Sequence, residues 1–258
     1  MEFEFVESNL RDSFRALASV RSSGDVRDFA GVSIASAGVT FQMFNAAFLA
    51  APVASEAELE RRITQAAVHF QARGLQWAYW VCTDWMEEKV RRRSRRVFER
   101  NNLRFSVELP GMIADHLLPP ERKLPEVRFE RVRNQQTRMA FCALGSQCFN
   151  VPLVWFNEVF DNDRVWDKFA GYVAYVEGEP VSSAATVTSS GAVGVYNVAT
   201  IPSHQRQGYA EAVLRHVLEK AREEHGIERT ILQSTPQGFS LYVRMGYRTV
   251  TKVAVYSS

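Results

Sequence analysis

The fold of this 258-residue chain is decided by one short stretch, Gln205-Arg206-Gln207-Gly208-Tyr209-Ala210. It lies between a strand-like run, Val193 to Thr200, and an amphipathic run that continues to Glu224. Gly208 has no Cβ, so the backbone can approach an anion closely, and the first N–H groups and the positive dipole end of the following helix favour negative charge. Arg206 can add a charge-assisted hydrogen bond. The sequence therefore predicts a phosphate-binding loop that opens a helix.

The run after this loop has the period of a helix with one buried face. Its apolar residues recur at i, i+3, i+4, i+7, i+8 and i+11: Ala210, Val213, Leu214, Val217, Leu218 and Ala221. Gly226 ends the helix. A β-prone run, Arg229 to Thr235, a short helical run, Gly238 to Met245, and an apolar strand-like tail, Val250 to Tyr256, follow. The predicted order is strand, phosphate loop, helix, strand, short helix, strand.

This order resembles that of the GCN5-related N-acetyltransferases (GNAT), whose phosphate loop reads Q/R-x-x-G-x-G/A and whose next block often ends in a tyrosine before a glycine-aromatic pair. Here Tyr242 precedes Gly246-Tyr247, and the resemblance covers Val127 to Ser258. Two positions depart from the family pattern. Thr235 stands where an asparagine is common, which weakens cofactor contacts there, and Gln205 stands where many members have arginine.

The resemblance implies an acetyl-CoA site. In the family, the central strand and its parallel neighbour, here Arg229 to Gln233, splay apart, and the pantetheine arm takes the vacant backbone bonds. The cofactor-binding residues implied in this chain are Val198, Ala199, Thr200, Gln205, Arg206, Gln207, Gly208, Tyr209, Ala210 and Thr235. No metal site is expected, because the five histidines and three cysteines show no ligand spacing.

The chemistry implied is direct attack of a neutral amine on the thioester, without an acyl-enzyme. A backbone donor near Val198 would stabilise the oxyanion, and Tyr242 matches the tyrosine that supplies a proton or hydrogen bond to the departing thiolate. Alternatively, Tyr242 only packs between helix and sheet. No general base stands out. Glu158, Asp161 and Asp163 follow an acceptor-side helix, but such acids are usually solvated, and a water chain could also serve.

The sequence predicts an α/β fold of two tandem GNAT-like domains, each a mixed, mostly antiparallel sheet flanked by helices. Prolines and charges between Leu117 and Pro125 indicate a boundary near residue 122, which gives domains 1–122 and 123–258. The elements expected in the first are the helix Val6 to Val20, strands Gly31 to Ala37 and Thr40 to Ala50 across a Gly38 turn, helix Ser55 to Arg73, strand Leu75 to Cys82, helix Met86 to Asn101 and strand Leu103 to Leu109. Those expected in the second, before the loop, are the strand Val127 to Asn134, helices Gln135 to Phe149 and Leu153 to Phe160, and the hairpin of Ala170 to Glu177 with Val181 to Ser189.

The corresponding loop of the first half, Ala50 to Glu56, contains no glycine. Glu56 and Glu58 fall in the first turn of the helix that follows, where their carboxylates would satisfy the N-terminus and repel a pyrophosphate. We therefore expect a degenerate, non-catalytic copy that frames a substrate cleft or pairs domains. A homodimer is one open alternative.

The composition of the chain is consistent with a folded α/β protein. The hydrophobic content of 46% allows a large core, and the net charge of only +2 gives no field for nucleic acid or an anionic membrane. The acidic start, Met1 to Glu7, is unlike a signal peptide, and no apolar run approaches the ~18 residues of a membrane span. We expect a cytoplasmic protein. Cys82, Cys142 and Cys148 are expected to be small buried side chains.

One basic run, Lys89 to Arg96, is compatible with RNA, an acidic peptide or a nucleotide-bearing substrate. Flanking glutamates and the inward-facing Val90 and Val97 favour instead an exposed helix face. The aromatic residues Trp77, Tyr79, Trp80 and Trp85 are expected in the core, although an aromatic wall for an acceptor is the alternative.

Two functions are consistent with these observations. The first is an acetyl-CoA-dependent N-acetyltransferase that acts on a small-molecule or peptide amine. The second is a coenzyme A sensor or scaffold that transfers nothing, which the Thr235 departure would permit. The phosphate loop supports both, whereas Tyr242 favours the enzyme.

Overall fold

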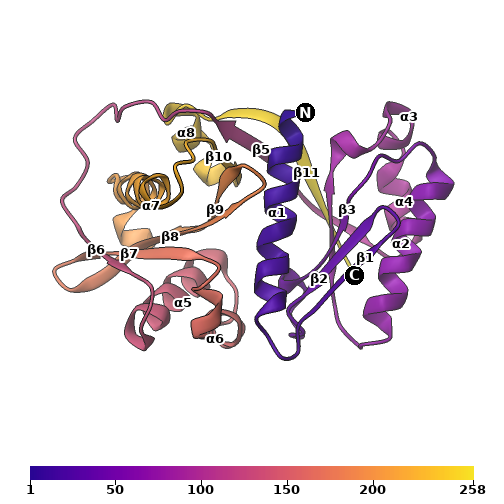
Figure 1. Cartoon of the computed structure of the whole chain (residues 1–258), viewed down its shortest axis with the longest axis horizontal. Helices are drawn as coiled ribbons and strands as arrows, with labels where there is room; N and C mark the ends of the chain where they lie inside the picture. The colour runs from indigo at the N-terminus through magenta and orange to yellow at the C-terminus, as the bar shows by residue number, and fades with distance from the viewer. The chain divides into compact units, whose positions relative to one another are not determined.

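The computed structural model describes the whole chain, Met1–Ser258, and divides into two compact units (Figure 1). The first unit contains Met1–Met112, Gln233–Thr235 and Thr249–Ser258, and the second contains Ile113–Leu232 and Pro236–Arg248. The units differ from the division predicted at residue 122, because the C-terminal segment joins the first unit. None of the helices combines the length and apolarity that crossing a membrane would require.

The first unit is a mixed sheet between helices. Its elements are α1 (Glu2–Ser19), β1 (Asp25–Phe29), β2 (Val32–Ser36), η1 (Gln42–Phe44), β3 (Asn45–Leu49), α2 (Glu56–Gln71), β4 (Ala78–Cys82), η2 (Thr83–Trp85), α3 (Glu88–Arg91), α4 (Ser94–Arg100), β5 (Arg104–Ala114) and β11 (Arg248–Ser257). The strand order is β1-β2-β3-β4-β11-β5, in which β3 and β4 are parallel and the pairs β1–β2, β2–β3 and β4–β11 are antiparallel. In Figure 1, α1 and α2 lie on opposite sides of β1 to β3.

The C-terminal strand β11 belongs to this unit because its side chains complete the core there. Tyr256 is 4% exposed and stacks on Phe98, with ring centroids 3.9 Å apart. Val253 to Ser257 pair with β4 residue by residue, from Cys82 back to Ala78. Phe70 and Trp77 stack deeper in the same core at 4.9 Å. Burying an aromatic ring of this size stabilises the unit that contains it by about 2–3 kcal/mol. The position of β11 in the sequence does not reveal which unit that is.

Three first-unit predictions differ from the structure. The exposed edge strand β1 was not predicted, because Asp25-Val26-Arg27-Asp28-Phe29 lacks apolar alternation. β2 and β3 pair as expected, but η1 separates them instead of a tight turn at Gly38. The helix predicted over Met86 to Asn101 is broken into α3 and α4 at Arg92 and Arg93.

The second unit is a smaller mixed sheet with helices on both faces. Its elements are β6 (Arg128–Arg131), α5 (Gln135–Phe149), α6 (Leu153–Phe160), η3 (Asp163–Val165), β7 (Ala170–Val176), β8 (Glu179–Ser189), β9 (Ala192–Thr200), η4 (Pro202–His204), α7 (Tyr209–His225), β10 (Thr230–Gln233) and α8 (Pro236–Arg244). The strand order is β10-β9-β8-β7-β6, with β9 and β10 parallel and the other pairs antiparallel. Figure 1 shows α7 on one face and α5 with α6 on the other. This arrangement confirms the α/β part of the predicted fold class, a mixed sheet flanked by helices.

One acidic side chain of the first unit, Glu7, is buried in a way that lowers stability when the side chain is ionised. Glu7 on α1 is 3% exposed, and neither carboxylate oxygen makes a hydrogen bond. Arg11 Nε lies 3.3 Å from Glu7 Oε1, which is close enough for attraction but lacks hydrogen-bond geometry. Burial, partly offset by Arg11, raises the pKa of Glu7 to about 7 from its ordinary 4.5. Between these values the folded chain holds a proton that the unfolded chain has released, so the free energy of unfolding falls as pH rises through this window.

We expect Glu7→Gln to stabilise the chain above pH 7 and to change little near pH 4.5, where Glu7 is protonated in the folded chain and half-protonated in the unfolded chain. The difference corresponds to about 2.5 pKa units and hence to about 3 kcal/mol at most. Urea unfolding at pH 8 and pH 4.5 measures it, with Glu4→Gln on the exposed side of the same helix as the control. An equal shift at both pH values would show that the effect is packing and not ionisation.

Candidate active site

The strand that carries the predicted site leaves its parallel neighbour early. β9 pairs with β10 only through Val193 with Thr230 and Gly194 with Ile231, and the Val193 N–H donates to the Arg229 carbonyl at 2.9 Å. Beyond Gly194, β9 continues to Thr200 with β8 alone. The splay expected from the family resemblance is therefore present, and one edge of β9 is not paired by β10 over Val195 to Thr200.

A β-bulge interrupts the other edge of β9 at the predicted cofactor residues. The register with β8 passes from Tyr196 opposite Ala185 to Ala199 opposite Ser183, so β9 has one residue more than β8 in this interval. Asn197 takes the left-handed conformation with φ +51°, which asparagine tolerates better than most residues. Neither Asn197 nor Val198 has a partner on β8 in this register. Bulges re-aim backbone groups next to active sites, and this one changes the direction of the backbone at Val198, the residue with the predicted oxyanion role.

The asparagine was the missed signal for this bulge. The strand reads Ala192-Val193-Gly194-Val195-Tyr196-Asn197-Val198-Ala199-Thr200, and Asn197 is its only side chain with a strong preference for positive φ over β structure. Its position one residue before Val198 could have predicted the bulge from sequence.

The loop after β9 has the backbone of an anion site. Arg206 and Gly208 both have positive φ, +61° and +96°, and α7 begins at Tyr209. Gly208 is the N-cap and supplies no side chain to the first turn, so no protein carboxylate or hydroxyl caps this helix. Successive N–H groups in such turns form a concavity for anions. The backbone present here therefore fits a pyrophosphate.

The side-chain amides of the two loop glutamines bind backbone carbonyls and hold the loop in place. Gln205 Nε2 donates to the Thr200 carbonyl at 3.1 Å, and Gln207 Nε2 donates to the Ser203 carbonyl at 2.9 Å. The first bond ties the end of β9 to the start of the loop, so that two predicted groups of cofactor residues are brought together. Tyr209 and Ala210, half-buried at the start of α7, continue them.

Cys148 is a residue of the site that sequence reasoning missed. Burial raises the pKa of its thiol, and the backbone of Thr200 partly offsets this rise. Because the next residue, Ile201, donates to Val181 on β8, alternation along the strand directs the Thr200 N–H away from β8. α5, whose C-terminal turn carries Cys148, packs against β9. Cys82 and Cys142 are buried as predicted, whereas Cys148 is half-buried.

Tyr242 lies on α8 and is 8% exposed. Its ring meets Tyr247 edge-on at 5.8 Å, and the Tyr247 hydroxyl accepts from Thr230 on β10 at 2.7 Å, which fixes α8 against the sheet. The ring also passes Gly238, where a Cβ would lie 2.7 Å from Tyr242 Cε2. Burial raises the pKa of Tyr242 to about 12, so the phenol remains protonated throughout the neutral range. The exposed Thr235 directly precedes this helix.

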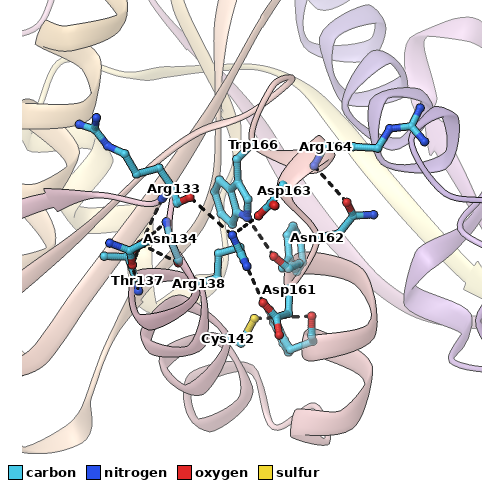
Figure 2. A network of polar contacts seen from close by, with 12 residues as sticks. Arg133, Asn134, Thr137, Arg138, Cys142, Asp161, Asn162, Asp163, Arg164 and Trp166 are labelled. Carbon is cyan, nitrogen blue, oxygen red and sulfur yellow. Dashed lines mark hydrogen bonds and ion pairs between the residues drawn. The ribbon is translucent and has the colours of Figure 1, made fainter.

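Two of the acids considered as general bases are committed to a structural network (Figure 2). Arg138 on α5 donates through Nε to Asp161 at 2.8 Å and also binds Asp163, while its side chain is only 13% exposed. Trp166 Nε1 donates to the Phe160 carbonyl at 2.9 Å in the same cluster. These bonds join α5 to the end of α6 and to η3. Glu158 lies on α6.

Comparison with known proteins agrees with this geometry. Residues 164–249 match the family model of the acetyltransferase (GNAT) domain. Residues 164–249 are therefore similar to a GNAT acetyltransferase domain, and the second unit, which contains most of them, is here called the GNAT domain. The matched segment contains β9, the loop, α7 and Tyr242, and it confirms the predicted enzyme class, an acetyltransferase. A search of curated protein sequences found no match.

Three solved structures share the fold. A GCN5-related N-acetyltransferase from Kribbella flavida has 17% identity and a TM-score of 0.74, with 98% of this chain and 95% of that chain covered. One from Sphaerobacter thermophilus has 12% identity and a TM-score of 0.59, with 90% and 82% covered. A GCN5-related N-acetyltransferase-like protein from Streptococcus suis has 14% identity and a TM-score of 0.57, with 98% of both chains covered. The fold they share extends over both units and not only over the GNAT domain.

In the first unit, the loop before α2 is bound by side chains of the protein itself. Arg62, 5% exposed, donates to the carbonyls of Ala51 and Pro52 at 2.7 and 2.9 Å and to Glu58 at 2.6 Å. Ser55 Oγ caps α2 by accepting from the Glu58 N–H at 3.2 Å. The Ala54 N–H and Arg62 hold the pKa of Glu58 below its ordinary value. The loop carbonyls and the helix N-terminus are therefore satisfied by protein groups.

The basic run of the first unit is an exposed face, as the sequence favoured. Its cations pair with glutamates: Lys89 with Glu87 at 3.1 Å, Arg93 with Glu56 at 2.9 Å, Arg95 with Glu99 at 3.0 Å, and Arg92 with Glu88. Val90 and Val97 point inward and are at most 1% exposed. Trp77 and Tyr79 are core residues, while Trp80 and Trp85 are half-buried.

The bulge at Asn197 predicts a conformational test. We expect Asn197→Val to destabilise the GNAT domain by about 1–2 kcal/mol relative to Asn197→Gly, because a β-branched residue resists positive φ and glycine does not. Denaturant unfolding of the two variants gives the difference. Equal stabilities would mean that the strand straightens and that the bulge is not a built feature.

Proposed function

We propose that this chain is a cytoplasmic, acetyl-CoA-dependent N-acetyltransferase that transfers an acetyl group directly to a primary amine of a small molecule or peptide. One observation carries the proposal. A strand edge that β10 does not cover beyond Gly194, a bulge at Asn197 and a glycine-capped helix follow one another along the chain. This run offers backbone donors to an extended amide-bearing arm and then to a phosphate group.

In this proposal, the backbone of Val198, Ala199 and Thr200 holds the pantetheine arm by strand-like hydrogen bonds. The N–H groups of Gln205 to Ala210 hold the pyrophosphate, and Arg206 adds charge. The direction of the Thr200 N–H supports this role, since the Ile201 N–H donates to Val181 on β8 and alternation then places the Thr200 N–H on the other side of the strand. Thr235 would contribute at the start of α8.

The reaction forms a C–N bond and breaks the C–S bond of the thioester, with the amine proton passing to solvent. Val198 N–H is proposed to donate to the carbonyl oxygen as charge develops on it. Tyr242 is proposed to donate a hydrogen bond to the departing sulfur. Because its pKa of about 12 lies above the ~8.5 of an ordinary thiol, Tyr242 stabilises that thiolate by hydrogen bonding more than by complete proton transfer.

The amine must lose a proton, and no side chain of the GNAT domain stands out as its base. Asp161 and Asp163 are held by Arg138, so they contribute to the packing of α5 and α6 instead. We propose that water carries the proton away, which requires the acceptor to bind as the neutral amine. The rate should then rise with pH until the acceptor is largely deprotonated.

We also propose that the chain is a tandem of two GNAT-like domains, divided in sequence near residue 122, with a degenerate first copy. Two features support this. Each unit contains a parallel pair formed across a helical crossover, β3–α2–β4 in the first and β9–α7–β10 in the second. In the first copy, Arg62 and Glu58 occupy the crossover loop with internal bonds, so that loop has no donors to offer a pyrophosphate.

Gly208→Glu is expected to abolish coenzyme A binding. The substitution places a carboxylate where the pyrophosphate is proposed to lie, in a residue with φ +96°. Gly178→Glu is the matched control, because Gly178 has a similar φ of +92°, open space around it and a position in the hairpin turn between β7 and β8. Calorimetry should show no binding for the first variant and unchanged binding for the second. Normal binding by Gly208→Glu would remove the loop from the cofactor site.

Tyr242→Phe is expected to lower kcat by about 10- to 100-fold and to leave the dissociation constant of acetyl-CoA almost unchanged, since the hydroxyl acts only as the thiolate forms. The ring packing against Tyr247 is retained in this variant. Steady-state kinetics together with calorimetry separate the two effects. Unchanged turnover would reduce Tyr242 to a packing residue.

The proposed activity itself is tested by thioester consumption in the presence of a panel of amines, with thermal stability measured in parallel. Release of free thiol that depends on an amine supports the enzyme. Stabilisation by coenzyme A without turnover of any amine would favour the alternative function, a coenzyme A sensor or scaffold.

A further inference from the structure

The segment that joins β5 to β6 is held against the GNAT domain at both ends. At its start, the Leu118 N–H donates to the Met245 carbonyl at 2.9 Å, and Asp115 binds Arg229 at 2.8 Å. At its end, β6 pairs with β7 from Arg128 to Arg131. Figure 1 shows this segment as a long loop that passes α8 and α7 on its way to β6. Its middle part is therefore confined to the surface between two fixed points.

The middle part lies directly on the phosphate loop. A Cβ added to Gly208 would be 3.0 Å from Pro125 Cδ and 3.7 Å from Arg122 Nη2. Arg122 Nη2 also lies 3.4 Å from the carbonyl oxygen of Arg206, at the long limit of a hydrogen bond. A guanidinium from the connecting segment thus reaches both residues of the loop that have positive φ.

The charges around Arg122 leave its guanidinium available to an anion. No carboxylate pairs with it, because the neighbouring acids are engaged elsewhere: Glu126 with Lys123 at 3.3 Å and Glu121 with Arg244 at 3.9 Å. Of the five N–H donors of a guanidinium, the long bond to Arg206 uses one. Its planar fork suits two phosphate oxygens better than a single carbonyl.

We propose that Arg122 is a cofactor-binding residue that donates to the pyrophosphate of acetyl-CoA, so that the connecting segment forms one wall of the phosphate site. The proposal rests on the proposed function. Arg122 lies outside the residues 164–249 that match the GNAT family model, and the sequence motif of the loop does not include it. It would add a second cation to Arg206 at a site otherwise built from backbone N–H groups.

Calorimetric titration of coenzyme A into the whole chain and into two variants tests this proposal. Arg122→Gln is expected to raise the dissociation constant about tenfold, since it removes a charge-assisted bond. Lys123→Gln is the matched control, because it removes the same charge from the next, 87%-exposed side chain, and its effect should stay below about twofold. Dephospho-coenzyme A keeps the pyrophosphate, so Arg122→Gln should weaken its binding by the same factor.

Three results would overturn the proposal: unchanged affinity in Arg122→Gln, an equal loss in Lys123→Gln, or a loss that disappears with dephospho-coenzyme A. Arg122→Lys should recover part of the affinity, which a mere folding defect would not allow. Absence of coenzyme A binding by the unsubstituted chain would instead overturn the proposed function, and the role of Arg122 with it.

Discussion

The departure of β9 from its sheet is the constraint on which the rest of the GNAT domain depends. A strand in the middle of a sheet normally has its backbone groups paired on both edges, because unpaired buried groups are costly. Here β9 pairs with β10 only as far as Gly194, and the bulge at Asn197 interrupts the ladder on the other edge. The strand then passes into a loop whose Arg206 and Gly208 both have positive φ. The lost pairing with β10, the bulge and the positive-φ residues each cost stability locally. Together they leave backbone N–H groups along the end of β9 and the loop that can donate to a ligand.

A comparison of the two units shows how side chains decide whether the backbone N–H groups before a helix remain available to a ligand. Both contain a strand–loop–helix crossover between parallel strands. In the GNAT domain, glycine caps α7 and leaves its first turn without a side-chain partner. In the first unit, Ser55 and Glu58 cap α2, and the buried guanidinium of Arg62 binds the loop carbonyls. The start of α7 therefore suits an anion from outside the protein. At the start of α2, the protein's own side chains make these hydrogen bonds and stabilise the first unit.

Sequence reasoning succeeded where local signals are strong. α5 and α6 have the bounds expected from the family resemblance, Gln135–Phe149 and Leu153–Phe160. In the structure, Asn134 caps α5 with Thr137, and Asn150 ends it in the left-handed conformation. The turn before α7 was predicted from Gly208, because a glycine at the start of a helix leaves the first N–H groups without a side-chain cap. The placement of Thr235 and Tyr242 as functional residues still depends on the family resemblance.

The failures have a common physical cause, which is that non-local pairing and side-chain competition leave weak traces in sequence. The tail that forms β11 is apolar and fits either sheet, and only its pairing with β4 and the stacking of Tyr256 assign it to the first unit. The break between α3 and α4 falls at Arg92 and Arg93, and the buried positions Val90 and Val97 keep a helical spacing across it. The burial of Arg62 was not predicted, because an arginine on a helix is normally expected to face solvent and its carbonyl partners are visible only in the structure.

The central claim is that one of two similar crossovers holds the cofactor and the other does not. Isothermal titration of the pure chain with acetyl-CoA tests it most directly, with thioester hydrolysis followed in the same samples. We predict saturable binding at one site per chain, as expected if α7 is open and α2 is closed by Arg62 and Glu58. Two sites per chain would contradict the degenerate first copy, and no binding would show that the loop before α7 is structural.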